Sequence, residues 1–157
     1  MPFNWKRLSM IGALAVAPDL SQVRTFVSFQ PGSVDTPRVL AFLRSLRRHL
    51  RLPVLLVWDR LAAHVSRHTR EWIHTQRHWL QVEWLPPYAP ELNPVERLWG
   101  HLQATRLGNY IPDDLAQLES QVRRGVRQVR GQDDLPFAFL RHSGLYPELY
   151  KVLRETQ

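Results

Sequence analysis

A proline-rich stretch restricts the possible folds of this chain more than any other feature. Residues 85–99, LPPYAPELNPVERLW, place four prolines within nine positions, the last of them Pro94. Proline locks φ and has no amide hydrogen, so this stretch can form neither a helix interior nor a central strand. Asn93 suits a helix N-cap and Pro94 suits the first helical position. The stretch therefore predicts a stiff connection that leads into a helix with Glu96 in its first turn.

Two interpretations of Glu96 remain open from the residues alone. It lies three positions after the predicted cap Asn93, so its carboxylate could reach back to the cap amide in a capping box. Alternatively, the helix N-terminus keeps the carboxylate ionised for function. The rigid lead-in would lower the entropy lost in holding it in place. The second interpretation predicts that Glu96 is aimed toward another acidic group.

Asp59 is the second carboxylate of interest. It ends the apolar run PVLLVWD, residues 53–59, which is typical of a strand buried on both faces in a parallel pairing. Ligands of open α/β sheets collect at the carboxyl ends of strands, and an unpaired buried acid is costly. A turn or capping role for Asp59 is the alternative. His64, five positions later, could orient Asp59 or a phosphate, or end a loop.

Two carboxylates, one ending a strand and one beginning a helix, favour a hard divalent cation. Magnesium prefers oxygen ligands and usually takes one or two protein carboxylates. Paired metals about 3.5–4 Å apart can activate water and stabilise the leaving oxygen in phosphodiester cleavage. The spacing of Asp59 and Glu96 along the chain does not decide this by itself.

The remaining pattern predicts one α/β domain with the element order β β α β α β α α. Apolar and alternating runs predict strands, and caps with apolar stripes predict helices. The predicted strands are 9–17, 23–29, 53–59 and 80–85, the first two antiparallel and joined by PDLSQ. The predicted helices begin near 36, 66, 93 and 113, and short helical pieces follow from 137.

The charge balance favours a nucleic-acid partner. Lysine and arginine number 21 against 14 acids, which gives +7. Nearly all of the cations are arginine, which binds phosphate through paired hydrogen bonds. A solvated basic surface remains the alternative. The absence of cysteine excludes disulfides and thiolate metal sites and suits a reducing cytosol. No apolar run approaches the length of a membrane span.

The segments LLVWDRLAAH and VEWLPPYAPELNPVERLWGHLQ together resemble the catalytic domain of DDE transposases. The similarity is to the bacterial insertion-sequence branch of the mariner superfamily. It extends from about Arg7 to the region near Tyr146, the C-terminal part of that catalytic domain. In that family a strand ends in the second catalytic aspartate, with a histidine shortly after. The third acid follows within an Asn-Pro-x-Glu motif.

The resemblance implies a ribonuclease H-like fold, a mixed sheet flanked by helices. It implies cleavage and joining of DNA strands at transposon ends, with Mg²⁺ or Mn²⁺ as cofactor. Asp59 and Glu96 would be the catalytic metal ligands, supported by His64 and Asn93. Arginines would hold the DNA backbone, and those nearest the motifs are Arg60, Arg67, Arg97 and Arg106.

This chain departs from the family pattern at three places. Arg60 stands where the family usually has asparagine, and Gln103 stands where it often has lysine. The first catalytic aspartate belongs to a central strand ahead of the element near Arg7. We expect Asp19 and Asp35 to lie in turns, so neither replaces it.

We therefore expect a single truncated catalytic domain over residues 1–157, with a core at about 7–110 and a helical part at about 111–157. It would lack the first central strand and be inactive unless an upstream fragment supplies it. A homodimer and a bacterial cytoplasmic, nucleoid-associated location would follow. The alternative is a non-catalytic DNA-binding remnant of a transposase. A different nuclease of the same fold is a third possibility.

Overall fold

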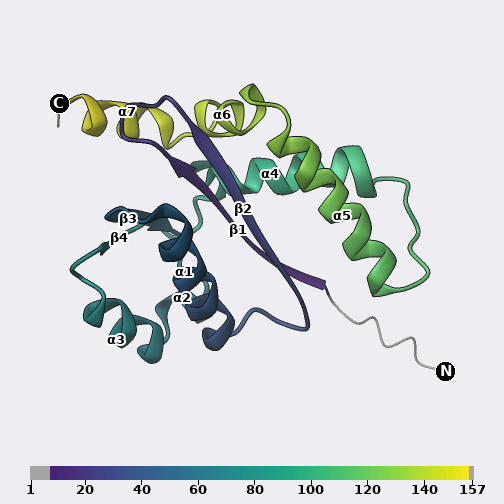
Figure 1. The fold of residues 1–157 in the computed structure, drawn as a ribbon, viewed down its shortest axis with the longest axis horizontal. Coiled ribbons are helices and arrows are strands. Elements are labelled where there is room, and N and C mark those ends of the chain that lie inside the picture. Colours follow the sequence, from purple (N-terminus) through teal and green to yellow (C-terminus); the bar gives the residue numbers. More distant parts are fainter. Residues whose placement is uncertain (1–7, 156–157) are drawn as a thin grey trace. The chain divides into compact units, whose positions relative to one another are not determined.

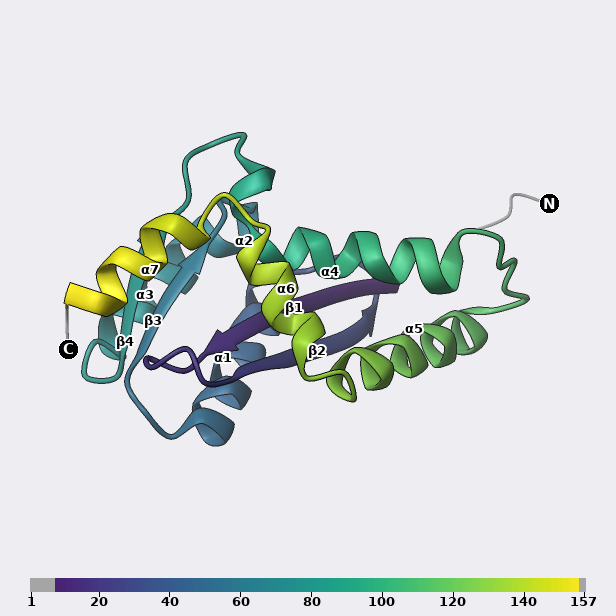
Figure 2. The same ribbon diagram turned by 90° about the horizontal axis from the view of Figure 1, so that it is seen from above.

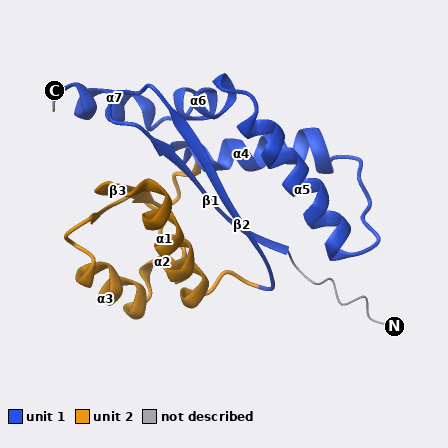
Figure 3. Ribbon diagram, viewed as in Figure 1, with its two compact units in different colours: residues 1–32, 91–157 blue, residues 33–90 orange. Residues whose placement is uncertain are grey.

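The computed structural model describes residues 8–155, so Arg7 lies outside the described residues. The chain forms two compact units, residues 1–32 with 91–157 and residues 33–90 (Figure 3). Each unit contains one two-stranded sheet. Because the chain passes from the first unit to the second and back, the candidate residues Asp59 and Glu96 belong to different units.

The first unit is built on a long antiparallel ribbon. Strands β1 (Leu8–Val16) and β2 (Val23–Pro31) pair along their whole length, as predicted. The helices of this unit are α4 (Pro94–Leu102), α5 (Leu115–Arg130), α6 (Asp134–Arg141) and α7 (Tyr146–Glu155). Helices α4, α5 and α6 pack against the ribbon (Figures 1 and 2).

The core of the first unit lies between the ribbon and these helices. The apolar stripe of α5 faces it, with Val122, Val126 and Val129 buried against Leu98 and Leu102 of α4. This burial follows from the helical spacing of the valines, which places them on one face of α5. The apolar face of α4 is thereby fixed in the core. The first turn of α4, which contains Glu96, lies at the N-terminal end of this helix.

The second unit contains a parallel strand pair and three helices. Its elements are α1 (Thr36–Leu50), β3 (Val54–Trp58), α2 (Ala62–Val65), α3 (Arg67–Thr75) and β4 (Leu80–Trp84). Asp35 caps α1 by accepting a hydrogen bond from the Arg38 amide at 3.1 Å. Strands β3 and β4 pair in parallel, as the apolar run 53–59 predicted.

Three details of the prediction are wrong. Strand β3 is not buried on both faces, because Leu55 is 48% exposed. The segment SRHTREWIHTQRHW from Ser66 predicts one helix to Trp79, but α3 ends at Thr75, where the Gln76 amide donates to the Ile73 carbonyl. The sequence predicts a helix from Asn93 to about Leu107 with Gly108 as its stop; the helix does reach Leu107, but Gln103–Leu107 forms a π-helix and Gly108 keeps right-handed helical angles. The pattern of apolar residues predicts where helices and strands form, but not how exposed a strand becomes or where a helix changes its hydrogen bonding.

No helix within residues 8–155 is long and apolar enough to cross a membrane.

Candidate active site

Asp59 lies immediately after β3, at the carboxyl end of the parallel pair, as the apolar run predicted. Its Oδ1 atom accepts a hydrogen bond from the Leu61 amide at 3.1 Å, so the turn role anticipated for this residue is real. The side chain stays 48% exposed. Asp59 therefore both closes the turn after β3 and presents carboxylate oxygen to solvent.

His64 is the principal partner of Asp59. Its Nδ1 atom donates to Asp59 Oδ1 at 2.9 Å and lies 3.1 Å from the Asp59 backbone oxygen. The imidazole stacks on the buried Trp58 ring, with centroids 4.1 Å apart and an interplanar angle of 10°. The short helix α2 carries His64 back to the strand end. Of the two roles considered for His64, the contacts favour orienting Asp59.

The environment keeps Asp59 ionised. The hydrogen bond from His64 lowers the pKa of the Asp59 carboxyl below its ordinary value, and the Leu61 amide adds to this effect. Partial burial acts in the opposite direction but does not prevail. A carboxylate that stays charged near neutral pH is the form that binds a divalent cation.

Glu96 lies in the first turn of α4, with its side chain exposed. The Asn93 side chain caps the helix by accepting from the Val95 amide at 3.2 Å. Within residues 8–155 the Glu96 carboxylate has no hydrogen bond or ion pair, so the capping-box interpretation is not realised.

The proline-rich segment before Glu96 is tied down at both ends. The Leu85 amide donates to the Trp58 carbonyl at 2.9 Å in the second unit. The Gly144 amide donates to the Glu91 carbonyl at 3.0 Å in the first unit. Between them, Tyr88 takes a left-handed backbone conformation with φ of 56°. A segment anchored and stiffened in this way restricts the backbone ahead of Glu96.

Asp19 and Asp35 have structural roles. Asp19 Oδ1 accepts from the Ser21 amide at 3.0 Å in the turn between β1 and β2. Asp35 caps α1. Both therefore fall in the connections where the sequence placed them, and neither ends a strand.

The four arginines predicted to bind DNA have different surroundings. Arg60 lies over the Trp84 ring at 5.7 Å, and Arg67 pairs with Glu71 at 2.7 Å. Arg97 borders a cavity of about 480 Å³ beside α6. Arg106 packs its stem against α5, where a side chain at Gly125 would meet it. Their role in DNA binding stays a prediction.

Comparison with known proteins places the chain in a family. A profile of the family described as "DDE superfamily endonuclease" matches residues 2–119. This chain belongs to the DDE superfamily endonucleases. A search of curated protein sequences found no match.

Solved structures show the fold of this DDE endonuclease chain. The catalytic domain of Mos1 mariner transposase superposes with a TM-score of 0.62 at 15% identity, over 95% of this chain and 80% of that one. The same domain with raltegravir and Mg gives 0.57 at 18% identity, over 95% and 75%. The complex with Mn gives 0.55 at 16% identity, over 95% and 81%. The expected ribonuclease H-like α/β fold is thereby confirmed.

The candidate residues of this DDE endonuclease chain suit a hard cation by their chemistry. Asp59 and Glu96 offer carboxylate oxygens, the donors that Mg²⁺ and Mn²⁺ prefer. Among the described residues of either unit, no three His, Cys, Asp or Glu side chains gather as a metal cluster.

The sequence missed the part that Trp58 plays beside Asp59. Its ring is buried and supports the imidazole of His64, whereas the sequence suggested a core role for Trp58 or, as the alternative, base stacking. The sequence feature that could have indicated this role is the position of Trp58, one residue before the acid at the end of the strand.

Proposed function

We propose that this chain is part of the catalytic domain of a transposase from the bacterial insertion-sequence branch of the mariner superfamily. Its reaction would be cleavage and joining of DNA strands at transposon ends. The observation that carries the proposal is the position of Asp59, held by His64, at the carboxyl end of β3 in a DDE superfamily chain. The unpaired Glu96 carboxylate in the first turn of α4 supports it.

Mg²⁺ or Mn²⁺ is the proposed cofactor, with Asp59 and Glu96 as protein ligands. When bound, such ions supply charge stabilisation to phosphodiester displacement. The two Mos1 structures that contain Mg and Mn support this choice. His64 would hold Asp59 in orientation through its 2.9 Å contact, and Asn93 would fix the start of α4.

We further propose that these 157 residues do not cut DNA efficiently alone. Asp19 and Asp35 are occupied by a turn and a cap, so neither serves as the third acid of the family. A further segment carrying an aspartate at a strand end would complete the site by complementation. Assembly as a homodimer and a nucleoid-associated location in the bacterial cytoplasm belong to the same proposal.

Nicking of supercoiled plasmid in Mg²⁺ tests this function, with and without a fragment from the upstream reading frame. We expect cleavage only with the fragment. Asp59→Asn or Glu96→Gln should reduce it about 100-fold or more, because several kcal/mol of charge stabilisation depends on the metal and each 1.36 kcal/mol is tenfold in rate. Glu91→Gln, a change at another exposed carboxylate, is the matched control and should retain activity.

Two outcomes would contradict parts of this proposal. Strong cutting by the lone chain, lost in Glu96→Gln, would disprove the need for a further acid. Cutting that survives both Asp59→Asn and Glu96→Gln would remove the assigned ligands.

The alternative function is DNA binding without catalysis. It is favoured by the excess of arginine, since guanidinium groups can hold a DNA backbone without any metal. Calorimetric titration with Mn²⁺ separates the two functions. Mn²⁺ binding that disappears in Asp59→Asn supports the catalytic proposal. A DNA affinity that changes neither with added metal nor with this substitution supports the alternative.

A further inference from the structure

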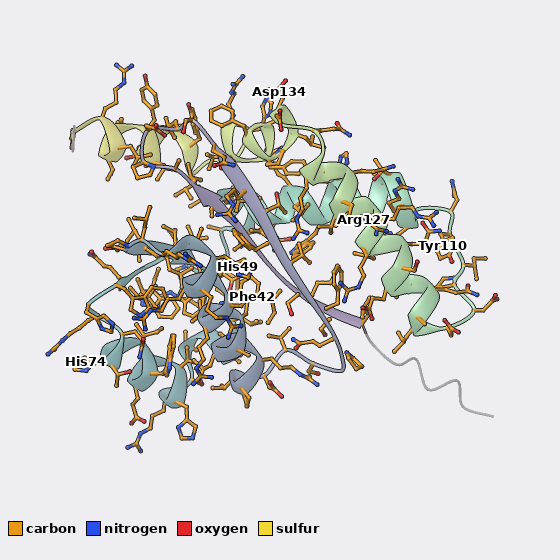
Figure 4. The ribbon with its side chains drawn as sticks, in the orientation of Figure 1. Phe42, His49, His74, Tyr110, Arg127 and Asp134 are labelled. Carbon is orange, nitrogen blue, oxygen red and sulfur yellow. The ribbon has the colours of Figure 1, made fainter. Side chains whose placement is uncertain are left out.

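A basic groove lies within the second unit, apart from Asp59. It has a volume of about 860 Å³ and runs between the C-terminal half of α1 and the end of α3. The labels His49 and His74 in Figure 4 mark the last turns of these two helices. The side chains that shape it are Arg44, Arg47, Arg48, Arg51, Trp72 and Trp79.

The four arginines form one row along α1 and its end. Their spacing of three and four residues places them on the same side of the helix. No carboxylate lines the groove, and no ion pair joins any of the four to an acid within residues 8–155. Residues 33–90 as a whole contain nine arginines and four acids. The positive charge of the row is therefore not neutralised locally.

Two tryptophans hold part of the row in place. The Arg44 guanidinium lies 5.5 Å from the Trp72 ring centre, and that of Arg47 lies 5.2 Å from the Trp79 ring centre. Gln76 Oε1 accepts from both Trp79 Nε1 at 2.8 Å and Arg47 Nη1 at 3.2 Å. Cation–π contacts and this shared acceptor lower the entropy that a ligand must overcome to order the arginines.

The surroundings of the tryptophans also indicate the kind of ligand. Trp79 is only 8% exposed and both rings lie beneath guanidinium groups, so neither is free to stack on a base. Single-stranded binding sites depend on such stacking. The exposed chemistry is instead that of guanidinium groups, which pair with phosphate oxygens.

Helix stabilisation does not explain the whole row. Basic residues in the last turn of α1 do complement the helix dipole. The dipole, however, amounts to only about half a unit of negative charge at the helix end. Four guanidinium groups exceed this several-fold, so most of their charge remains available to an external anion.

We propose that this groove binds the sugar-phosphate backbone of duplex DNA without reading its sequence. The inference rests on the proposed function for the identity of the ligand and adds a binding surface separate from the candidate metal ligands. From Arg44 to Arg51 the helix rises about 10 Å at 1.5 Å per residue. One DNA strand carries a phosphate per about 3.4 Å of axis, so the row spans about three phosphate steps of one strand.

Fluorescence anisotropy with a 20-base-pair duplex of arbitrary sequence in EDTA tests the groove, because it needs no metal and no cleavage. The test variant is Arg44→Gln with Arg48→Gln in the full chain. The control variant, Arg38→Gln with Arg123→Gln, removes the same charge from arginines that pair with Asp35 and Glu119. We expect the groove variant to bind at least fivefold more weakly than the control. The slope of log affinity against log salt should fall by about 1–2, since each phosphate contact contributes about 0.9.

Each outcome bears on the proposal. Equal weakening of DNA binding by the groove and control variants would overturn the proposal. Tighter binding of the chain to a poly-glutamate peptide of matched charge than to the duplex would also overturn it. If the double variant unfolds, the DNA affinity of the single variant Arg48→Gln tests the proposal instead. This substitution removes no hydrogen bond or ion pair, because the Arg48 side chain makes none within residues 8–155. A chain that binds no DNA fails both this inference and the proposed function. If the groove variant binds DNA as tightly as the wild-type chain, this inference is wrong but the proposed function is not contradicted.

Discussion

At the scale of single residues, Asp59 illustrates how one carboxylate can serve fold and function together. Its Oδ1 atom closes the turn to Leu61 and accepts from His64, and its side chain remains half exposed. The hydrogen bonds that hold the turn are also those that lower the pKa of the carboxyl. A structural role and a metal-binding role therefore require the same ionised state.

The lowered pKa predicts how stability depends on pH. Because the folded pKa of Asp59 lies below its unfolded value of about 3.9, ionisation stabilises the fold. This contribution is complete above the unfolded pKa and is lost as pH falls through the folded pKa. Asp59→Asn should lower the free energy of unfolding by about 1 kcal/mol at pH 7, a modest amount for a half-exposed pair.

Urea unfolding of both proteins in EDTA, from pH 7 to pH 3, measures this difference. It should begin to shrink below about pH 4, where the Asp59 carboxyl of the unfolded wild-type chain takes up a proton before that of the folded chain does. In a His64→Ala background the effect of Asp59→Asn should be much smaller at every pH, because the largest cause of the pKa shift is gone. A difference that stays constant with pH would contradict the assignment.

At the scale of elements, glycines decide how closely the helices approach. A Cβ built at Gly125 of α5 would lie 2.7 Å from Leu102 Cδ2, inside the core of the first unit. Gly12 of β1 allows the same approach to the Trp99 ring at 2.7 Å. Helix α4 is therefore seated against both the ribbon and α5 by positions that carry no side chain.

Two glycine substitutions should change stability in opposite directions. Gly125→Ala should lower the free energy of unfolding by about 1–3 kcal/mol, because Leu102 has no room to move in the packed core. Gly100→Ala, on α4, meets nothing within 4 Å and should raise it by about 0.5–1 kcal/mol through helix propensity. Thermal unfolding of the two variants provides the measurement. A shift of the same sign in both would contradict this description of the packing.

At the scale of the whole molecule, the chain divides its apolar core between two units. The first unit contains the cluster built on α4 and α5, including Leu98. The second unit buries Leu43 and Leu46 of α1 within residues 33–90. Compact units with separate cores can open with different free energies.

Hydrogen exchange should reveal this division. Leu98→Ala removes a side chain that is 0% exposed and should cost about 2–5 kcal/mol. Amides of α4 and α5 should lose more protection than those of α1 and β3. Leu43→Ala, at 2% exposure, is the matched change in the second unit and should produce the reverse pattern. Equal loss across all amides in both variants would show a single cooperative unit instead.

Local patterns were sufficient to predict the elements and the positions of the two acids. The apolar run ending at Asp59, the cap at Asn93 and the valine stripe of α5 all describe interactions within a few residues along the chain. Caps, periodicity and proline act at that range, so they can be read without the fold. The Pro-rich motif also carried the resemblance to DDE transposases, and the profile match bears out the DDE endonuclease superfamily.

Only the tertiary structure decided which distant side chains meet. The stacking of His64 on Trp58, the exposure of Leu55 and the contact of α1 arginines with Trp72 and Trp79 were not predicted. Each depends on how two elements pack, and packing depends on the shapes and volumes of side chains far apart in the chain. The sequence by itself therefore determined where the carboxylates lie along their elements. The fold lowered the pKa of Asp59 and placed Trp72 and Trp79 against the arginines of α1.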